Sequence, residues 1–217
     1  MDRIVQAFAA AERIMNKIEQ VNLGLDTSHD ILDVVWQGGL PNGLYANYGA
    51  SRLVIWDDEC DYVIKMPIGP YDEKYCRREV EIYSAAVEEG LEDLFGWCAC
   101  YREPEEYKCG IYVMEFLSGN EDEIFDSAWN YGYQKFCDEY GLDSSIEDNK
   151  EEYEANHYDY NTDNANMLEL FESLIDGVKA SLLDRFLAKW HINDLHAGNY
   201  LYRGLDLVIC DYAGCGW

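Results

Sequence analysis

The sequence has few basic residues for its length. Only 16 Lys and Arg oppose 43 Asp and Glu among 217 residues, and the formal net charge is −27 at pH 7. A strongly negative surface repels phosphate backbones and anionic lipid head groups. The charge therefore argues against direct binding to nucleic acid or membrane, and it favours a basic protein surface as partner.

Long apolar runs and metal-type cysteine spacing are also lacking. No run approaches the ~20 residues of a membrane span, and the N-terminus is amphipathic where a signal peptide would be apolar. The eight cysteines are scattered, apart from a C-x-C at Cys98 and Cys100. We therefore expect free thiols and a cytoplasmic protein.

Two acidic residues and an amide near the end of the sequence have the spacing that phosphoryl transfer requires. Asp194 precedes Asn199 by five positions, and Asp211 follows an alternating stretch, 205–210, that predicts a short strand. Phosphoryl transfer needs magnesium ligands and a carboxylate that orients the attacking hydroxyl. Asp194 would orient the acceptor, and Asn199 and Asp211 would bind the metal. Taken singly, such residues are also common in turns and caps.

The stretch 194–199 reads DLHAGN and resembles the D-L-H-x-G-N loop of the protein-kinase-like superfamily, particularly its aminoglycoside-phosphotransferase-like and phage-type members. Two positions depart from the family pattern. The usual histidine two places before the aspartate is Ile192, and the usual D-F-G is Asp211-Tyr212-Ala213. These departures bear on catalysis more than on fold.

The upstream half supplies two residues that this chemistry needs. Lys65 lies near the end of the apolar stretch 61–67, which resembles the family's V-A-I-K strand; alternatively, it is an edge lysine that points to water. Glu79 lies on the apolar stripe of a helix predicted over 75–90, where an unpaired carboxylate is costly to bury. The resemblance implies a Lys65–Glu79 ion pair, with Glu81 as the fallback partner.

Two further segments are candidate nucleotide-binding elements. Gly49, Ala50 and Ser51 form a turn between predicted strands, and they resemble a shortened phosphate-covering loop; a plain hairpin with Gly49 at positive φ is the alternative. The stretch 110–117 resembles the strand and hinge that receive adenine, although any core strand could carry it. Met114 would be the gatekeeper there, and Glu115, Phe116 and Leu117 the hinge. The resemblance implies ATP and Mg²⁺ as cofactors.

Two helices are predicted outside these motifs. Apolar residues recur at helical spacing over 2–21, namely Ile4, Phe8, Ala11, Met15 and Ile18; this helix would pack on the body of the protein or on another copy. A longer helix is predicted over 167–190, with Leu170, Leu174, Val178 and Leu182 facing inward. His191 and His196 are more consistent with a phosphate contact or a loop hydrogen bond than with a zinc site.

Acidic and tyrosine residues dominate 119–166, for which we predict one or two helices plus a flexible segment. This segment would be either a solubilising insertion or a dedicated binding surface.

The predicted fold is α+β: a minimal, two-lobed, kinase-like fold with a small antiparallel sheet, one helix and a reduced helical lower lobe. The predicted parts are an N-terminal helix (1–30), an upper lobe with hinge (31–118), the acidic insertion (119–166) and a reduced lower lobe (167–217). Because little sequence follows Asp211, substrate recognition would come from the acidic insertion, the N-terminal helix or a partner.

The predicted function is an ATP- and magnesium-dependent phosphotransferase of unknown acceptor. The alternative is an inactive, pseudokinase-type binding protein, including an acidic mimic of nucleic acid that inhibits a host defence or nucleic-acid-binding protein.

Overall fold

The computed structural model describes residues 2–20, 28–38, 40, 43–69, 71–105 and 109–213. The chain forms two compact units. The first unit comprises Met1–Glu88 and Gly96–Phe116, and the second comprises Glu89–Phe95 and Leu117–Trp217. The predicted fold class is confirmed: the chain is α+β, with a small antiparallel sheet in one unit and mainly helices in the other.

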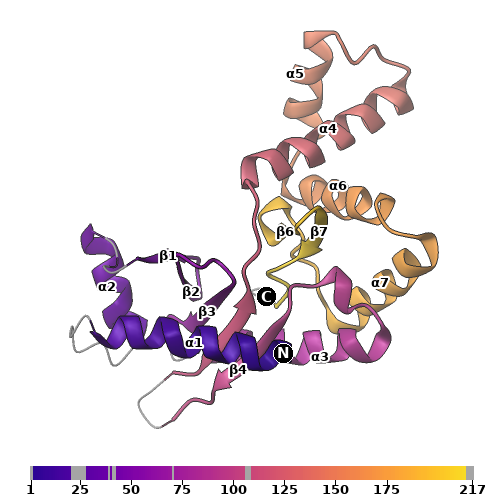
Figure 1. Ribbon diagram of the computed structural model, residues 1–217. Helices are drawn as coiled ribbons and strands as arrows, with labels where there is room; N and C mark the ends of the chain where they lie inside the picture. The colour runs from indigo at the N-terminus through magenta and orange to yellow at the C-terminus, as the bar shows by residue number, and fades with distance from the viewer. Residues whose placement is uncertain are drawn as a thin grey trace. The chain divides into compact units, whose positions relative to one another are not determined.

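The first unit contains a five-stranded sheet (Figure 1). Its strands, in spatial order, are β1 (Leu44–Tyr48), β2 (Arg52–Asp57), β3 (Tyr62–Pro67), β5 (Ile111–Glu115) and β4 (Cys98–Arg102). All neighbouring strands are antiparallel. The three strands predicted over 44–66 and the strand predicted over 110–117 are confirmed, whereas β4 was not predicted. The central strand β3 is buried along its whole length.

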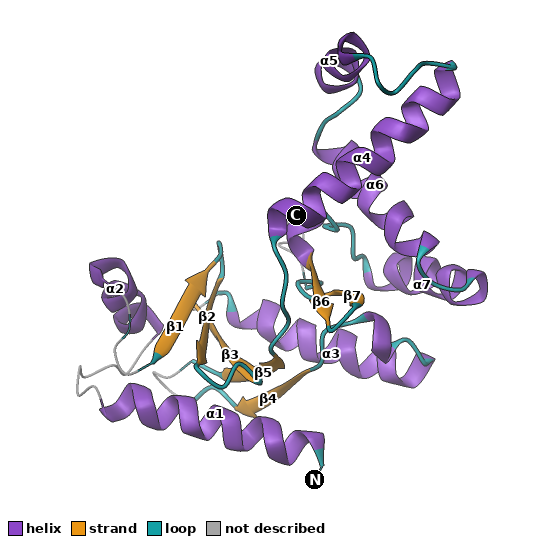
Figure 2. Ribbon diagram, turned by 45° about the horizontal axis from the view of Figure 1, so that its top comes forward, coloured by secondary structure: helices purple, strands orange, loops and turns teal. Residues whose placement is uncertain are grey.

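Helices α1 (Arg3–Gln20) and α3 (Glu73–Glu89) lie on opposite faces of this sheet (Figure 2). Successive strand residues point to opposite faces, so Arg52 and Asp57 of β2 point in opposite directions. Asp57 contacts α1, and Arg52 contacts α3. A further helix, α2 (Ser28–Gly38), lies beside β1, where Trp36 meets Tyr48 edge to face.

Helix α1 packs on the sheet through a stripe that differs from the predicted one and shares only Ala11 and Ile18 with it. Its buried residues are Ala7, Ala10, Ala11, Ile14 and Ile18. The predicted inward residue Ile4 is 41% exposed. Alanines lie at the contact because a small side chain lets the helix backbone approach the strands closely. Of the two predicted packing partners, the body of the protein is the one observed.

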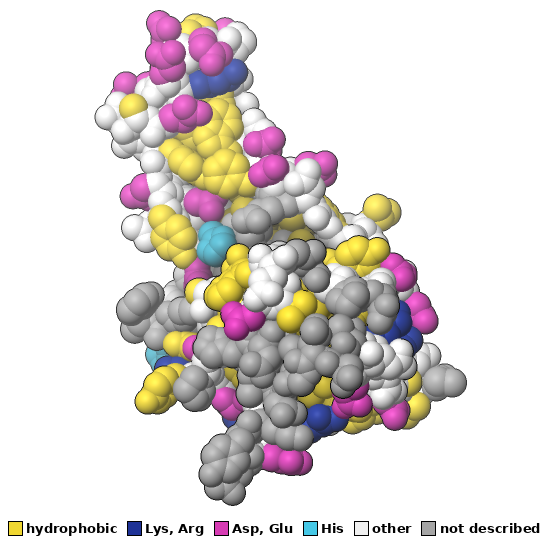
Figure 3. Space-filling view, turned by 90° about the vertical axis from the view of Figure 1, so that its left-hand side faces the viewer, with side chains coloured by type: hydrophobic (Ala, Val, Ile, Leu, Met, Phe, Trp, Pro, Cys, Tyr) yellow, Lys and Arg dark blue, Asp and Glu magenta, His cyan; other side chains and the backbone are white. Residues whose placement is uncertain are grey.

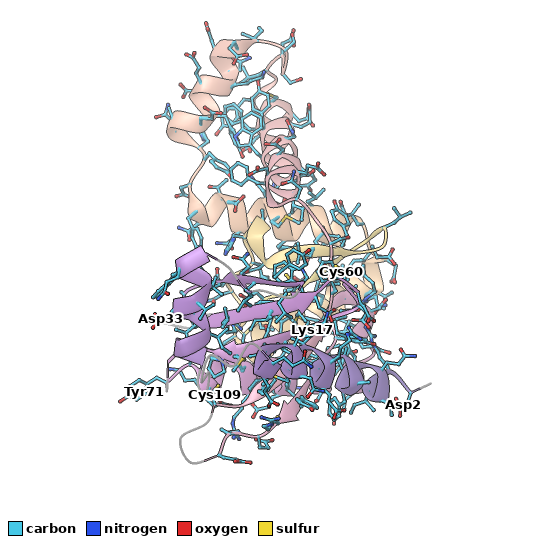
Figure 4. The ribbon with its side chains drawn as sticks, turned by 60° about the vertical axis from the view of Figure 1, so that its left-hand side comes forward. Asp2, Lys17, Asp33, Cys60, Tyr71 and Cys109 are labelled. Carbon is cyan, nitrogen blue, oxygen red and sulfur yellow. The ribbon has the colours of Figure 1, made fainter. Side chains whose placement is uncertain are left out.

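A charged network joins α1 to the sheet. Asp57, which is fully buried, accepts hydrogen bonds from Arg13 Nε at 2.7 Å and from Lys17 Nζ at 2.9 Å. Figure 4 labels Lys17 on α1. Burial alone would raise the pKa of Asp57, but the hydrogen bonds from Arg13 and Lys17 outweigh it and lower the pKa to about 2. Asp57 therefore remains ionised at neutral pH and holds the helix to the strand.

Replacing Asp57 by alanine should destabilise the first unit by about 3 kcal/mol, because the change removes the carboxylate from a buried ion-pair network. The pKa is lowered in the folded state, so this contribution is present above pH ~4 and is lost as the pH falls towards ~2. Urea unfolding from neutral to acid pH measures both effects. Asp61→Ala is the matched control, since Asp61 also binds Arg13 but is exposed. An equal loss in both variants would contradict the account.

The second unit consists of four longer helices and a two-stranded hairpin (Figure 1). The helices are α4 (Glu121–Tyr140), α5 (Glu147–Asn156), α6 (Tyr160–Ser173) and α7 (Gly177–Trp190). The hairpin pairs β6 (Tyr200–Arg203) with β7 (Asp206–Ile209), which confirms the short strand predicted before Asp211. Two 3₁₀ turns, η1 (Glu92–Leu94) and η2 (Ala197–Asn199), complete the unit.

The acidic, tyrosine-rich stretch is mostly helical, because α4, α5 and the first half of α6 cover it. Helices α4 and α5 enclose an aromatic cluster of Tyr133, Phe136, Cys137 and Tyr153, with Trp129 and Tyr158 against it. A Cβ on Gly132 would lie 1.9 Å from Asn166 Nδ2, so only glycine allows α4 to approach α6 this closely. Tyr133 and Tyr153 are buried because they form the core of this helical segment.

The single helix predicted over 167–190 is two helices. Asp176 caps the start of α7 by accepting from the backbone N–H groups of Val178 and Lys179. The break changes the buried face, so that the predicted inward residues Leu174 and Val178 are 63% and 74% exposed. Buried instead are Met167 and Phe171 of α6 and Leu183, Phe186 and Leu187 of α7. In the described part of the chain no helix has the length and apolar character of a membrane span.

Candidate functional site

A buried ion pair joins the predicted lysine and glutamate in the first unit. Lys65 Nζ lies 3.0 Å from Glu79 Oε1, and the two side chains are 9% and 2% exposed. Lys65 pairs with Val54 of β2 and Tyr112 of β5, so it is a central residue and the edge alternative is wrong. The pairing partner is Glu79; the fallback residue Glu81 is exposed.

A third residue, which the sequence analysis did not predict, contacts this ion pair. Arg52 Nη1 contacts the same Glu79 oxygen at 3.2 Å and is also buried. Arg52 and Lys65 point to the same face of neighbouring strands, and α3 places Glu79 against both. Arg52 is two residues from Val54, so the two side chains lie on the same face of β2, and Val54 pairs with Lys65 of β3. The period of two in a strand was the signal that could have placed Arg52 on the face of Lys65.

Besides burial, the Glu79 carboxylate raises the pKa of the Cys76 thiol, which lies on the same face of α3. Burial, and then the charge of Glu79, raise the pKa of Cys76 to about 12. This cysteine therefore stays a neutral thiol at neutral pH, because burial outweighs the charges of Arg52 and Lys65, which lower its pKa.

The predicted phosphate-covering turn is the β1–β2 hairpin. Gly49 N–H donates to Arg52 O at 3.0 Å. Gly49 is not among the residues at positive φ, so this part of the hairpin alternative is wrong. A Cβ on Gly49 would meet no described atom within 4 Å. Ala50 is exposed and Ser51 is buried. Binding of phosphate by these three residues remains a prediction.

In the predicted hinge, two backbone donors already have partners. Glu115 N–H donates to Trp97 O at 3.0 Å, and Phe116 N–H donates to Asp61 O at 3.1 Å. The Glu115 carboxylate also accepts from Trp97 N–H and forms an ion pair with Arg3 of α1. Among the described residues none accepts from Leu117 N–H. Met114, in the predicted gatekeeper position, is buried.

The DLHAGN loop in the second unit is held by its own side chains. Asn199 Nδ2 donates to Asp194 O at 2.7 Å, which closes the loop. His196 Nδ1 accepts from Gly198 N–H at 3.1 Å, as expected of a loop hydrogen bond. His191 ends α7 with φ 52° in the left-handed region. His191 therefore ends the helix before the loop, and His196 fixes a turn within the loop.

Backbone pairing brings Asp211 to the same end of the hairpin as Asn199. Tyr200 pairs with Ile209, and Cys210 N–H then donates to Asn199 O at 2.9 Å. Asp211 is the next residue, so the predicted metal ligands flank one end of β6 and β7. Ile192, two positions before Asp194, is buried.

The donor atoms of this pair fit a magnesium ion. Magnesium takes oxygen ligands and keeps several waters, so one or two protein oxygens are enough to hold it beside substrate phosphates. No described residue donates to Asn199 Oδ1, and Asp211 supplies a carboxylate. The described residues contain no group of three or more His, Cys, Asp or Glu that could hold a metal by themselves. The arrangement therefore suits magnesium bound together with phosphates.

A tyrosine contacts the predicted catalytic aspartate, and sequence reasoning missed it. The Tyr160 hydroxyl, at the start of α6, donates a hydrogen bond to Asp194 Oδ1. That hydrogen bond raises the pKa of Tyr160 above its ordinary value. Asn164, one turn later on α6, accepts from the Leu195 backbone N–H at 2.8 Å. Two contacts thus fix the start of α6 to the loop.

Comparison with known proteins gives only distant similarity. No protein-family model matches the chain, and no curated protein matches it significantly. Solved structures with similarity include aminoglycoside phosphotransferase APH(2'')-Ib with ADP bound, at 14% identity and a TM-score of 0.38 over 86% of this chain and 70% of that one. The complex of APH(2'')-IIa with streptomycin and ATP has 14% identity and a TM-score of 0.37, over 85% of this chain and 71% of that one. At these values the similarity carries no functional argument.

Proposed function

We propose that this protein is a kinase-like phosphotransferase that uses ATP with magnesium. The observation that carries the proposal is the buried pair of Lys65, on a central strand, and Glu79, on α3. Burying a lysine and a carboxylate is costly, and the cost is offset only by close pairing. A lysine held in this way can position phosphates, which is its use in nucleotide-dependent phosphoryl transfer.

The loop residues of the second unit take the remaining roles in the proposal. Asp194 would accept the hydrogen bond of the acceptor hydroxyl and take its proton as the new bond to phosphorus forms. Asn199 and Asp211 would hold magnesium, which supplies neutralisation of the phosphate charge when bound. Gly49, Ala50 and Ser51 would lie over the phosphates, and Leu117 would receive the adenine. The proposal places the protein in the cytoplasm, where ATP is available.

If Asp211 binds magnesium, its substitution should change nucleotide binding without changing the stability of the nucleotide-free protein. Asp211→Asn removes a charge that would bind magnesium but keeps the shape of the side chain. The variant should therefore keep the stability of the nucleotide-free protein and lose magnesium-dependent nucleotide binding. Thermal unfolding with and without ATP and magnesium measures both properties. A destabilised variant with unchanged nucleotide affinity would show that Asp211 is structural.

A second candidate function is an inactive, kinase-like binding protein that acts through its acidic surface. Two observations favour it. Ile192 stands where the family has a histidine, and α5 exposes Glu147, Asp148, Glu151, Glu152 and Glu154. Figure 3 shows acidic side chains around the hydrophobic ones on the α4–α5 arm. A basic protein surface, such as a nucleic-acid-binding cleft of a host protein, is the partner that this charge fits.

Two sets of variants separate the candidates. Lys65→Ala with Asp194→Ala should abolish phosphoryl transfer, while Glu151→Gln, Glu152→Gln and Glu154→Gln together should leave ATP turnover almost unchanged. If the acidic surface is the working part, the second set should instead weaken binding to a basic partner, and added salt should do the same. A biological effect that survives the first set and is lost in the second would overturn the phosphotransferase proposal.

A further inference from the structure

The contact between Tyr160 and Asp194 places a hydroxyl of this chain where a phosphoryl acceptor belongs. A catalytic carboxylate in phosphoryl transfer accepts a hydrogen bond from the hydroxyl that attacks phosphorus. Tyr160 makes this hydrogen bond to Asp194 Oδ1. The contact is between side chains 34 positions apart, so it results from the fold and not from local chain geometry.

The surroundings of Tyr160 keep its hydroxyl at this position. Asp159 caps α6 by accepting from Thr162 N–H at 2.8 Å, which fixes the first turn of the helix. Asn164 donates to Tyr160 O at 3.0 Å and accepts from Leu195 N–H, so one amide links the tyrosine backbone to the loop. The ring also lies near His196, with centroids 5.9 Å apart. Yet the residue is 59% exposed, which leaves it accessible to a reagent from solvent.

We propose that Tyr160 is a phosphoacceptor of this protein and is modified within the same chain. The proposal rests on the phosphotransferase function proposed above, and its co-reactant is a magnesium-bound nucleoside triphosphate. The Tyr160 oxygen forms a bond to the γ-phosphorus, and the bond from that phosphorus to the bridging oxygen breaks. The nucleoside diphosphate leaves with the electron pair, and the phenolic proton passes to Asp194 and then to water.

The modification changes the environment of Asp194. A phosphorylated tyrosine has no hydroxyl proton to donate, and its phosphate carries about −1.5 to −2 charges at neutral pH. The hydrogen bond to Asp194 is therefore lost, and repulsion between phosphate and carboxylate replaces it. The modified side chain leaves Asp194 Oδ1, and this oxygen becomes available to the hydroxyl of another acceptor.

The test uses the full chain with magnesium and ATP labelled in the γ-phosphate. We expect label on Tyr160, located by peptide mass spectrometry, at a rate that does not depend on protein concentration. Tyr160→Phe should abolish this label, and Asp194→Ala should slow its appearance roughly a hundredfold or more.

Two other tyrosines of the second unit give matched controls. Tyr140→Phe alters a similarly exposed tyrosine, and Tyr158→Phe removes a hydroxyl that donates to a different carboxylate, that of Asp163 at 2.9 Å. Both variants should keep the label.

Thermal unfolding of the same samples distinguishes failure of the Tyr160 acceptor assignment from failure of the phosphotransferase proposal. If ATP with magnesium stabilises the protein but Tyr160 acquires no label, the acceptor assignment is overturned and the phosphotransferase proposal stands. If there is neither stabilisation nor label, both are overturned. Label on Tyr160 whose rate rises with protein concentration would overturn modification within the same chain.

Discussion

The Glu79→Ala variant is expected to lose about 3 kcal/mol of unfolding free energy, because it removes a buried carboxylate from between two buried cations. Lys65 and Arg52 both contact Glu79 Oε1, at 3.0 and 3.2 Å. Without the carboxylate, two desolvated positive charges remain side by side. Chemical denaturation at neutral pH measures the loss, and nucleotide binding should fall with it because Lys65 is no longer held in place.

Two further variants show which property of Glu79 is responsible. Glu79→Gln keeps the shape and an acceptor oxygen but removes the charge, so it should also be destabilised. Glu81→Ala changes an exposed carboxylate on the same helix and should stay within about 0.5 kcal/mol of the parent protein. Equal stability of Glu79→Ala and Glu81→Ala would mean that the buried pair does not contribute as described.

The Asp194→Ala variant should reduce phosphoryl transfer by roughly 10²–10⁴-fold, the range that a positioned general base contributes. Stability should change little, because the lost contact with Tyr160 lies at the surface. Nucleotide binding should also persist, since the proposal gives Asp194 a role towards the acceptor and none towards the phosphates. Steady-state turnover together with nucleotide titration separates these quantities.

An aspartate on the hairpin of the same unit provides the comparison for Asp194. Asp206 lies in β7 and is exposed. Asp206→Ala should leave turnover unchanged. If Asp194→Ala transfers phosphate as fast as Asp206→Ala, the loop is not the reaction site.

Part of the buried pair could be predicted from the residues alone: a glutamate on an apolar helix face needs a partner, because an unpaired carboxylate is costly to bury. The choice of Lys65 as that partner came from the resemblance to the kinase-like superfamily. The alternating pattern likewise gave the strands around Lys65 and the short strand before Asp211. The strand patterns depend only on neighbouring residues, and the alternation seen in the sequence is also the alternation of faces in the folded strands.

The features that were missed depend on long-range contacts or on a competing local signal. Tyr160 is one of 18 tyrosines, and no local pattern connects it with Asp194. Arg52 alternates like any strand residue, and its role depends on where α3 lies. For α6 and α7, the apolar residues Leu174 and Val178 continued a helical period, but the cap at Asp176 ended it. For Tyr160 and Arg52 the missing information was a contact that a single sequence does not display, whereas for α6 and α7 it was a local capping signal that the helical period concealed.

Thermal or chemical unfolding with and without ATP and magnesium tests the central claim most directly. At a ligand concentration of a hundred times the dissociation constant, the protein should be stabilised by ~2.7 kcal/mol. Magnesium alone should give a much smaller effect, and Lys65→Ala should abolish the stabilisation by ATP. Lys74→Ala, which changes an exposed lysine of α3, should preserve it. A folded parent protein that ATP with magnesium does not stabilise at any concentration would contradict the account.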